Sequence, residues 1–287
     1  MSSNPAGLRQ PFFAPFFSRS VNYVRASPGI VAGGGMLLLL LLASFLAPLP
    51  HDPMTPDPTA VLLAPSSEYV FGTDANGFDV FSRVIAAGRS DLPLALMGTL
   101  ASLVIGLLIG LPLSVKSKWS EGFMRALDAF QSFPLIVLSV TIVSLTGNDI
   151  QNILYAIVII NGPRFIRLIR GEALSIRDGR FIEAAIATGA RPRRVVFRHV
   201  MPNVVDVCLV QCSLTTANAV IVIAALNFLG IGVSPPTPTW GSMVQVGAQA
   251  ISTGQWWIAI WPGVAIFIAI ASLNMLANGI QRQVEGS

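Results

Sequence analysis

The sequence predicts an all-α integral membrane protein with six transmembrane helices, and three observations carry this prediction. Apolar residues make up 53% of the 287 residues and charged residues only 11%, whereas soluble domains carry about 25% charged residues. Six apolar stretches are each long enough to cross about 30 Å of hydrocarbon as a helix. Basic segments alternate with acidic or neutral ones, as in chains that cross a membrane repeatedly. Composition therefore excludes a soluble globular enzyme, a disordered tail and a fibrous protein.

The six predicted spans follow the apolar stretches in chain order. Helices are expected because lipid cannot satisfy the polar groups of an open backbone, and the alternating segments of a membrane β-barrel do not occur. The first stretch is longer than the apolar core of a cleaved signal peptide, so we expect it to remain as a span. The predicted spans cover residues 28–49, 92–115, 123–145, 150–169, 203–229 and 256–276.

The distribution of charge sets the predicted orientation. Residues 1–27 carry three arginines and no acid, and residues 164–198 carry nine arginines against three acids. Residues 50–91 carry six acids against two arginines. Because basic segments stay on the cytoplasmic side, both termini and the segment at 171–202 are predicted to be cytoplasmic. Residues 50–91 are predicted to be extracytoplasmic.

The segment at 171–202 is the most informative part of the sequence. It fits two short helices, the first of which ends at Gly189, a residue suited to the left-handed turn that terminates helices. The second begins near Pro192, since proline suits the first turn of a helix. Pro202 is expected to break the chain just before the fifth span.

A motif within this segment has the features of a docking surface. Small side chains at Ala184 and Ala185 would let the backbone of another protein approach closely, and Glu183 offers one charge for a specific pairing. The run Glu183-Ala-Ala, three residues, Gly189, nine residues and His-Val-Met-Pro202 resembles the EAA loop of ABC importer permeases. In that family the loop forms a coupling helix, which docks on the ATP-binding subunit and transmits its closure to the membrane spans.

Two further stretches resemble the oligopeptide/dipeptide/nickel branch of this family, specifically its C-type subunit. Residues 71–83 match the extracytoplasmic segment before the second span, except that Phe78 stands where the branch usually has arginine. Residues 228–241 match the loop after the fifth span closely. The resemblance covers roughly residues 25–283, but the C-terminal end departs from the branch pattern, so the role of its charges stays open.

The resemblance implies the fold of a type I ABC importer permease, with a cytoplasmic coupling helix, and assigns roles to particular residues. Coupling to the ATPase is expected of the motif residues Glu183, Ala184, Ala185, Gly189, Arg198, His199 and Pro202. Contacts with a binding protein or at the gate are expected of Asp74, Asp79, Arg83, Pro235, Pro236 and Trp240. For the first three of these, an ordered surface segment without such contacts is the alternative.

The implied function is that of a permease subunit, with residues 28–283 as its transmembrane domain, in an ATP-driven importer of peptides. The implied partners are a second homologous permease, two ATP-binding subunits and an extracytoplasmic substrate-binding protein, all at a bacterial cytoplasmic membrane. Alternatives are a permease for nickel chelates, glutathione or another small solute, and an ion-coupled secondary transporter. The transporter would need acids at the middle of the membrane, whereas Asp128 and Asp206 lie near the inner ends of their spans and are expected to pair with arginines.

No catalytic, metal or cofactor site is predicted in this chain. The sequence has no Gly-x-x-x-x-Gly-Lys-Ser/Thr phosphate loop, so ATP and magnesium are expected on partner subunits and the chain is not expected to be an enzyme. His51 and His199 are predicted on opposite sides of the membrane, which argues against a shared metal site. The basic strip at 191–194 lacks interleaved aromatic residues, so no nucleic-acid partner is expected.

Overall fold

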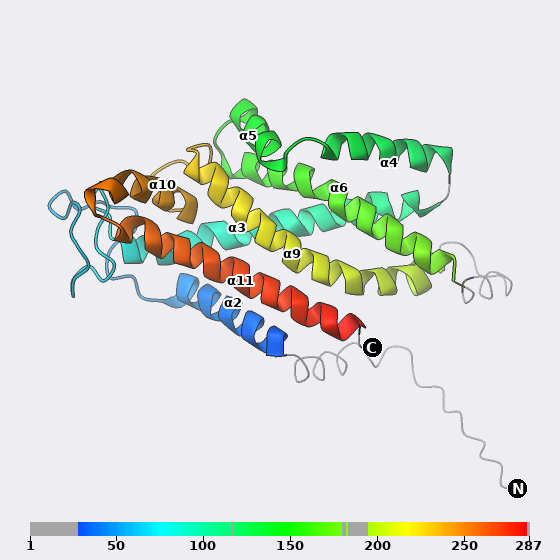
Figure 1. Cartoon of the computed structure of the whole chain (residues 1–287), viewed down its shortest axis with the longest axis horizontal. Coiled ribbons are helices and arrows are strands. Elements are labelled where there is room, and N and C mark those ends of the chain that lie inside the picture. Colours follow the sequence, from blue (N-terminus) through cyan, green and yellow to red (C-terminus); the bar gives the residue numbers. More distant parts are fainter. Residues whose placement is uncertain (1–27, 116, 180–181, 183–194, 286–287) are drawn as a thin grey trace, which may run out of the picture.

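The computed structural model describes residues 28–115, 117–179, 182 and 195–285, and within these ranges it is built from helices and loops. The long helices lie side by side in an elongated bundle (Figure 1). Five of the described helices are long and apolar enough to cross a membrane, and one bent pair would make a sixth span. The α-helices are α2 (Pro28–Leu46), α3 (Val80–Gly110), α4 (Lys118–Gln131), α5 (Leu135–Thr146), α6 (Ile150–Arg177), α9 (Met201–Phe228), α10 (Trp240–Ala250) and α11 (Trp257–Glu285).

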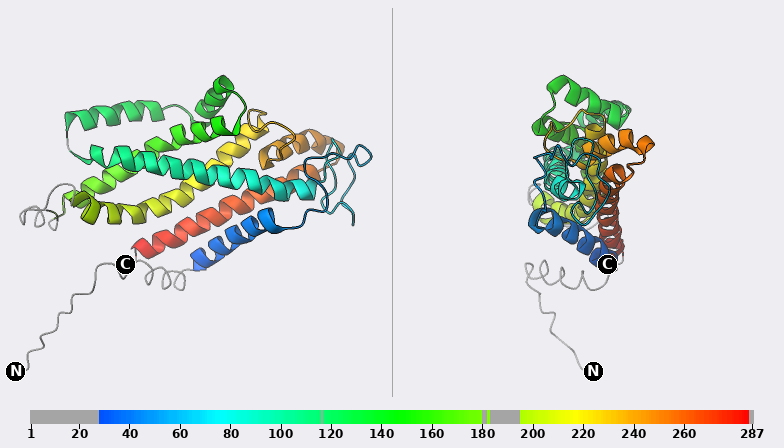
Figure 2. Two further views of the ribbon diagram at one scale, coloured as in Figure 1. Left: turned by 180° about the vertical axis from the view of Figure 1, so that it is seen from behind. Right: turned by 90° about the vertical axis from the view of Figure 1, so that its left-hand side faces the viewer.

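The bundle has two ends of different character. Residues 47–79 and 229–256, with α10 among them, gather at one end, which we call the loop end (Figures 1 and 2). Residues 111–115, the end of α6 and the start of α9 lie at the opposite end, which we call the connection end because the chain passes there from α6 to α9. The larger apolar core joins α3, α6, α9, α10 and α11, while a second, smaller cluster lies toward the α6–α9 connection.

Helix α3 starts earlier than its predicted span. The span was predicted from residue 92, but the helix begins at Val80 because Asp79 caps its first turn. The Asp79 carboxylate accepts hydrogen bonds from the backbone N–H groups of Phe81 and Ser82, at 3.3 and 3.0 Å, as an N-cap residue does. Residues of the predicted extracytoplasmic segment therefore form the first turns of a long helix.

The predicted span at 123–145 is not one straight helix. Helix α4 ends at Gln131 and α5 begins at Leu135, and the two axes differ by 86°. Pro134 lies in the break, and a proline disfavours the helical conformation of the residue before it. Helix α5 packs against α6, whereas α4 makes fewer contacts with α6 and lies at the edge of the bundle (Figure 1).

The chain is not broken at Pro202 as predicted. The backbone forms a π-helical turn over Val196–Val200 and continues into α9, whose first turn contains Pro202. Proline is accepted there because its missing N–H is not needed in the first turn of a helix. Because of the π-helical turn, the backbone stays helical from Val196 into α9.

Helix α2 packs on α11 through a close backbone contact. A Cβ atom built at Gly33 would lie 2.6 Å from both the Ser272 carbonyl oxygen and the Leu276 nitrogen. Only glycine allows this approach, which is the usual way for membrane helices to pack where lipid offers no hydrophobic driving force. Arg89 of α3 then donates a hydrogen bond to the carbonyl of Ser44, near the end of α2.

Candidate functional site

The segment predicted to couple to an ATPase begins and ends in the apolar interior of the connection end. Ile182, Val195 and Val200 are all buried. They pack in one cluster with Phe165 and Ile169 of α6, Val204 and Cys208 of α9, and leucines of α3. A displacement of this segment would therefore press directly on three long helices, because a close-packed interior transmits strain.

The predicted coupling residues fall in two groups. Glu183, Ala184, Ala185 and Gly189 lie outside the described residues, as does the side chain of His199. Arg198 and Pro202 are exposed where the segment returns to the bundle. The coupling role of both groups stays a prediction. The structure shows that buried residues on either side of the motif, Ile182 before it and Val195 and Val200 after it, anchor the segment to the bundle.

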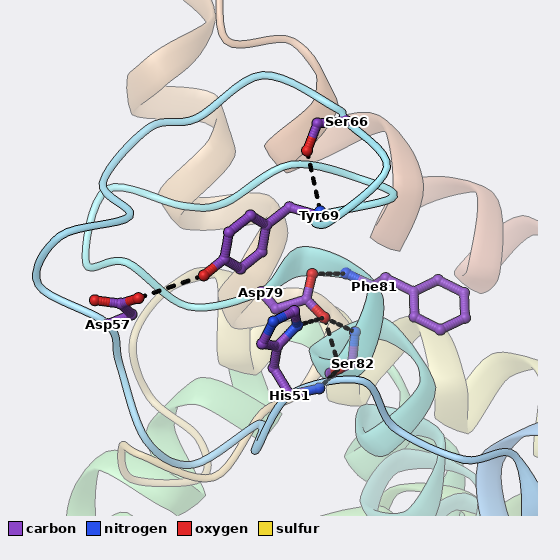
Figure 3. A network of polar contacts seen from close by, with 7 residues as sticks. All are labelled: His51, Asp57, Ser66, Tyr69, Asp79, Phe81 and Ser82. Atoms are coloured by element: carbon purple, nitrogen blue, oxygen red, sulfur yellow. Dashed lines mark hydrogen bonds and ion pairs between the residues drawn. The ribbon is translucent and has the colours of Figure 1, made fainter.

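At the loop end, a polar network joins the segment before α3 to the start of that helix (Figure 3). The His51 ring stacks on Tyr69 with centroids 4.6 Å apart, and its Nδ1 lies 3.5 Å from the Asp79 carboxylate. Ser82 donates both its N–H and its hydroxyl to the same carboxylate oxygen. Tyr69 in turn donates its hydroxyl to Asp57, at 3.4 Å. Asp79 thus holds a loop and a helix together.

Asp74 and Arg83 stabilise the same segment from within. The Asp74 carboxylate accepts hydrogen bonds from the N–H groups of Asn76 and Phe78, at 2.8 and 3.0 Å. Arg83 stacks over the Phe78 ring at 4.0 Å and donates to the Pro53 carbonyl at 2.9 Å. Phe78, which stands where the resembled branch has arginine, thereby gives the Arg83 cation an aromatic face.

The pKa values of the acids in this segment are shifted in different directions because their surroundings differ. Burial raises the pKa of Asp74, while its backbone hydrogen bonds and the Arg83 charge act in the opposite direction. Hydrogen bonds from Thr59 lower the pKa of the partly exposed Asp57, and bonds from Met54 and Thr55 lower that of the exposed Asp52. A lowered pKa keeps Asp52 and Asp57 negatively charged at neutral pH.

Three residues predicted as surface contacts are buried in this chain. Asp74, Asp79 and Arg83 expose between 3% and 8% of their surface, so they organise the segment, and a direct contact with a binding protein stays a prediction. Pro235 and Pro236 are exposed at the loop end. His51 and Tyr69 belong to the network, although nothing in their local sequence singles them out.

Trp240, also predicted as a gate or binding-protein contact, lies in the core at the start of α10. It is 1% exposed, and its Nε1 donates to the Val84 carbonyl at 2.9 Å. Its backbone N–H donates to the Asp91 carboxylate at 2.9 Å, and Asp91 is itself only 1% exposed. In the sequence, Asp91 contributes only to the negative charge of residues 50–91. In the structure it accepts a hydrogen bond at the start of α10, a helix that is remote in sequence.

One ion pair joins charged residues of α4 and α6. The predicted pairing of Asp128 with an arginine is confirmed, since its carboxylate forms an ion pair with Arg167 of α6. The side chain of Asp206 lies outside the described part. Among the described residues, no group of three or more metal-ligating side chains comes together.

Comparison with known proteins places the chain in a family. Residues 102–287 match the family model described as binding-protein-dependent transport system inner membrane component. The chain is 35% identical to the dipeptide transport system permease protein DppC of Alkalihalophilus pseudofirmus, over 78% of this chain and 74% of that protein. It is 33% identical to a protein of Brucella suis named as a peptide permease, over 81% and 78% of the two chains.

A solved structure has the same fold. A chain of the methionine ABC transporter MetNI, in an inward-facing conformation, superposes with a TM-score of 0.57 at 20% identity. The match covers 71% of this chain and 95% of that chain, and it identifies the fold as that of a type I ABC importer permease. The chain belongs to the family of inner membrane components of binding-protein-dependent transport systems.

Proposed function

We propose that this chain is the permease subunit of an ATP-driven peptide importer. Membership of the permease family supports the transport role, and the relatives named as dipeptide and peptide permeases support the substrate class. The substrate would cross between this chain and a second, homologous permease. Two ATP-binding subunits would dock on the cytoplasmic side and carry the ATP and magnesium, and a binding protein would deliver peptide on the other side.

The geometry that carries the proposal is the anchoring of the coupling segment. Both of its flanks, Ile182 on one side and Val195 and Val200 on the other, are buried against α3, α6 and α9. Docking of an ATP-binding subunit on the residues between them would move three helices together. The connection end would then face the cytoplasm, as would both termini, in agreement with the arginines that predict this orientation.

The loop end would receive the binding protein. Its polar network holds residues 50–79 together, and the exposed Asp52 and the partly exposed Asp57 present negative charges there. Pro235 and Pro236 extend the same exposed surface beside the start of α10. This surface offers charge and shape for recognition, while buried Asp74, Asp79 and Arg83 would act by holding it in place.

A charge reversal tests the coupling role. Glu183→Lys should abolish co-purification of the ATP-binding subunits and peptide uptake, because it replaces the single acid of the docking motif with a like charge for any basic partner. Glu68→Lys, which changes an exposed acid at the loop end, is the matched control and should retain the ATPase. Uptake of labelled di- and oligopeptides by cells expressing the whole operon measures the substrate class.

Two results would change the proposal in different ways. If Glu183→Lys purified with its ATPase and transported peptides normally, the coupling site would be wrong. If the wild-type complex imported glutathione or a nickel chelate and ignored peptides, the substrate class would be wrong and the importer would stand.

A further inference from the structure

Helix α6 carries a row of arginines at the end that leads into the coupling segment. Arg164, Arg167, Arg170 and Arg177 follow one another along its last turns. In the sequence such arginines read as anchors at the membrane surface or as partners for an ATPase. In the structure, three of them contact other parts of this chain, and all three contacts lead to α4 or to the connection between α3 and α4.

Arg170 and Arg177 hold the connection. The Nε of Arg170 donates to the Leu113 carbonyl and to the Ser120 hydroxyl, both at 3.0 Å. Ser120 donates in turn to the Leu113 carbonyl at 2.6 Å, and Arg177 Nη1 donates to the Ser114 carbonyl at 3.4 Å. Carbonyls where a helix has just ended lack partners within it, and cationic side chains satisfy them well.

Arg167 holds α4 itself. Its guanidinium forms an ion pair with Asp128, and the two side chains are 48% and 59% exposed. Ser120 is the single buried residue of α4, and Trp119 is 83% exposed. Helix α4 is therefore attached to the rest of this chain mainly by polar contacts and little by apolar packing.

One face of α4 is charged, and this limits what the helix can border. Lys118, Glu121, Arg125 and Asp128 recur at intervals of three and four residues and are all exposed, so they form one face of the helix. Such a face is costly to place against lipid. Helix α4 therefore borders water or another subunit, and a shift of α4 changes that border.

We propose that Arg167, Arg170 and Arg177 are positioning residues that make α4 follow α6 when the coupling segment moves. The inference rests on the proposed function, because it needs that segment to be driven by an ATPase. The mechanical path runs from the buried flanks of the segment into α6, and from the three arginines into α4 and the α3–α4 connection. Without them, α4 would keep the Ser120–Leu113 hydrogen bond, the contacts of its partly buried apolar residues and its connections to α3 and α5.

A charge swap in the complete transporter tests this path. The whole complex is reconstituted in lipid nanodiscs with Arg167→Asp, with Asp128→Arg, and with both together. For distances, Cys208 and Cys212 are replaced by alanine, and spin labels are placed on cysteines at Ala129 of α4 and Gly171 of α6, both exposed. The label distance is measured by electron paramagnetic resonance with and without a non-hydrolysable ATP analogue.

In the wild type, the distance distribution should be narrow and unchanged by nucleotide, because the two helices move together. Each single reversal should broaden it and should lower the peptide imported per ATP hydrolysed, in vesicles, by about fivefold, the scale of a partly exposed ion pair. The double swap should restore both readouts, which a loss of folding would not allow. Arg125→Asp is the matched control on α4, since Arg125 is exposed and has no ion pair within the described residues.

The outcomes separate this inference from the proposed function. Narrow distributions and normal uptake in both single variants would overturn the positioning role while leaving the importer intact. A double swap that stays broad would overturn it as well. A wild-type complex without peptide uptake would refute the proposed function, and the label distances would still decide whether α4 follows α6.

Discussion

Gly77 should be among the least replaceable residues of the loop end, and Gly77→Ala tests the account of that segment. Its φ is +83°, in the left-handed region that disfavours a side chain. A Cβ atom there would lie 2.1 Å from the Asp57 carbonyl oxygen and 2.9 Å from its carbonyl carbon. Both are backbone atoms, so the neighbour cannot turn aside as a flexible side chain would. The Asp57 N–H also donates to the Gly77 carbonyl at 3.0 Å, and the clash would break this bond.

The expected cost has two parts. The left-handed conformation costs a residue with a Cβ about 1–2 kcal/mol, and forcing an extra carbon into a filled space costs about 1–3 kcal/mol. The sum is about 2–5 kcal/mol, and each 1.4 kcal/mol is a factor of ten. Hydrogen exchange of the Asp57 amide, followed by mass spectrometry in nanodiscs, should therefore accelerate by roughly thirtyfold to a few thousandfold.

Two other glycines separate the two contributions. Gly254 has a φ of +94° but no atom within 4 Å of its Cβ position, so Gly254→Ala should show the conformational cost alone in its own turn. Gly122, in α4, has neither a positive φ nor a near atom, and Gly122→Ala should stabilise its helix by about 1 kcal/mol. Wild-type exchange in Gly77→Ala would contradict the backbone clash, and an equal cost in Gly254→Ala would show that the clash adds nothing to the conformational cost.

Two further predictions concern buried carboxylates. Asp91→Ala should cost about 1–3 kcal/mol in thermal unfolding, because it leaves the buried Trp240 N–H without an acceptor, whereas Asp91→Asn keeps an acceptor and should cost less; equal losses would argue against the hydrogen bond. Burial raises the pKa of Asp74 in the folded protein above its ordinary value of 3.8. The protonated Asp74 therefore contributes fully to the stability of its segment below pH 3.8, and this contribution is lost as the pH rises through the raised pKa of the folded state. Asp74→Asn should flatten this decline in hydrogen exchange, and an unchanged slope would assign it to another group.

The sequence predicted the number of apolar stretches well because hydropathy over about 20 residues reports burial in lipid directly. It predicted the shape of the third stretch poorly. A hydropathy window joins α4 to α5, although Pro134 marks the break and the charges from Lys118 to Asp128 mark an amphipathic helix. Both signals are present in the sequence. They are lost when hydropathy is averaged over a window, because the average keeps neither the position of a proline nor the spacing of charges.

The contacts of the loop end could not be predicted from the local sequence. Asp79 was recognised within a motif, but the residues that join it, His51 and Tyr69, come from a preceding loop. Trp240 was expected as a binding-protein or gate contact, yet it is buried and its partner Asp91 lies 149 positions away. The local sequence shows which side chains can accept a hydrogen bond from a backbone N–H group. It does not show which N–H group, remote in sequence, will donate to them.

The two ends of the bundle are held by interactions that differ in how easily they reopen. At the loop end, Asp79 and Asp91 are buried and accept hydrogen bonds from backbone N–H groups, and removing such partners is costly. At the connection end, Arg167 and Asp128 form a half-exposed pair, which links α4 to α6 less strongly than a buried cap would. Segments open most readily where buried apolar contacts are few. The loop end can therefore keep its shape while helices move at the connection end, which suits a chain that presents one fixed surface and is driven at the other.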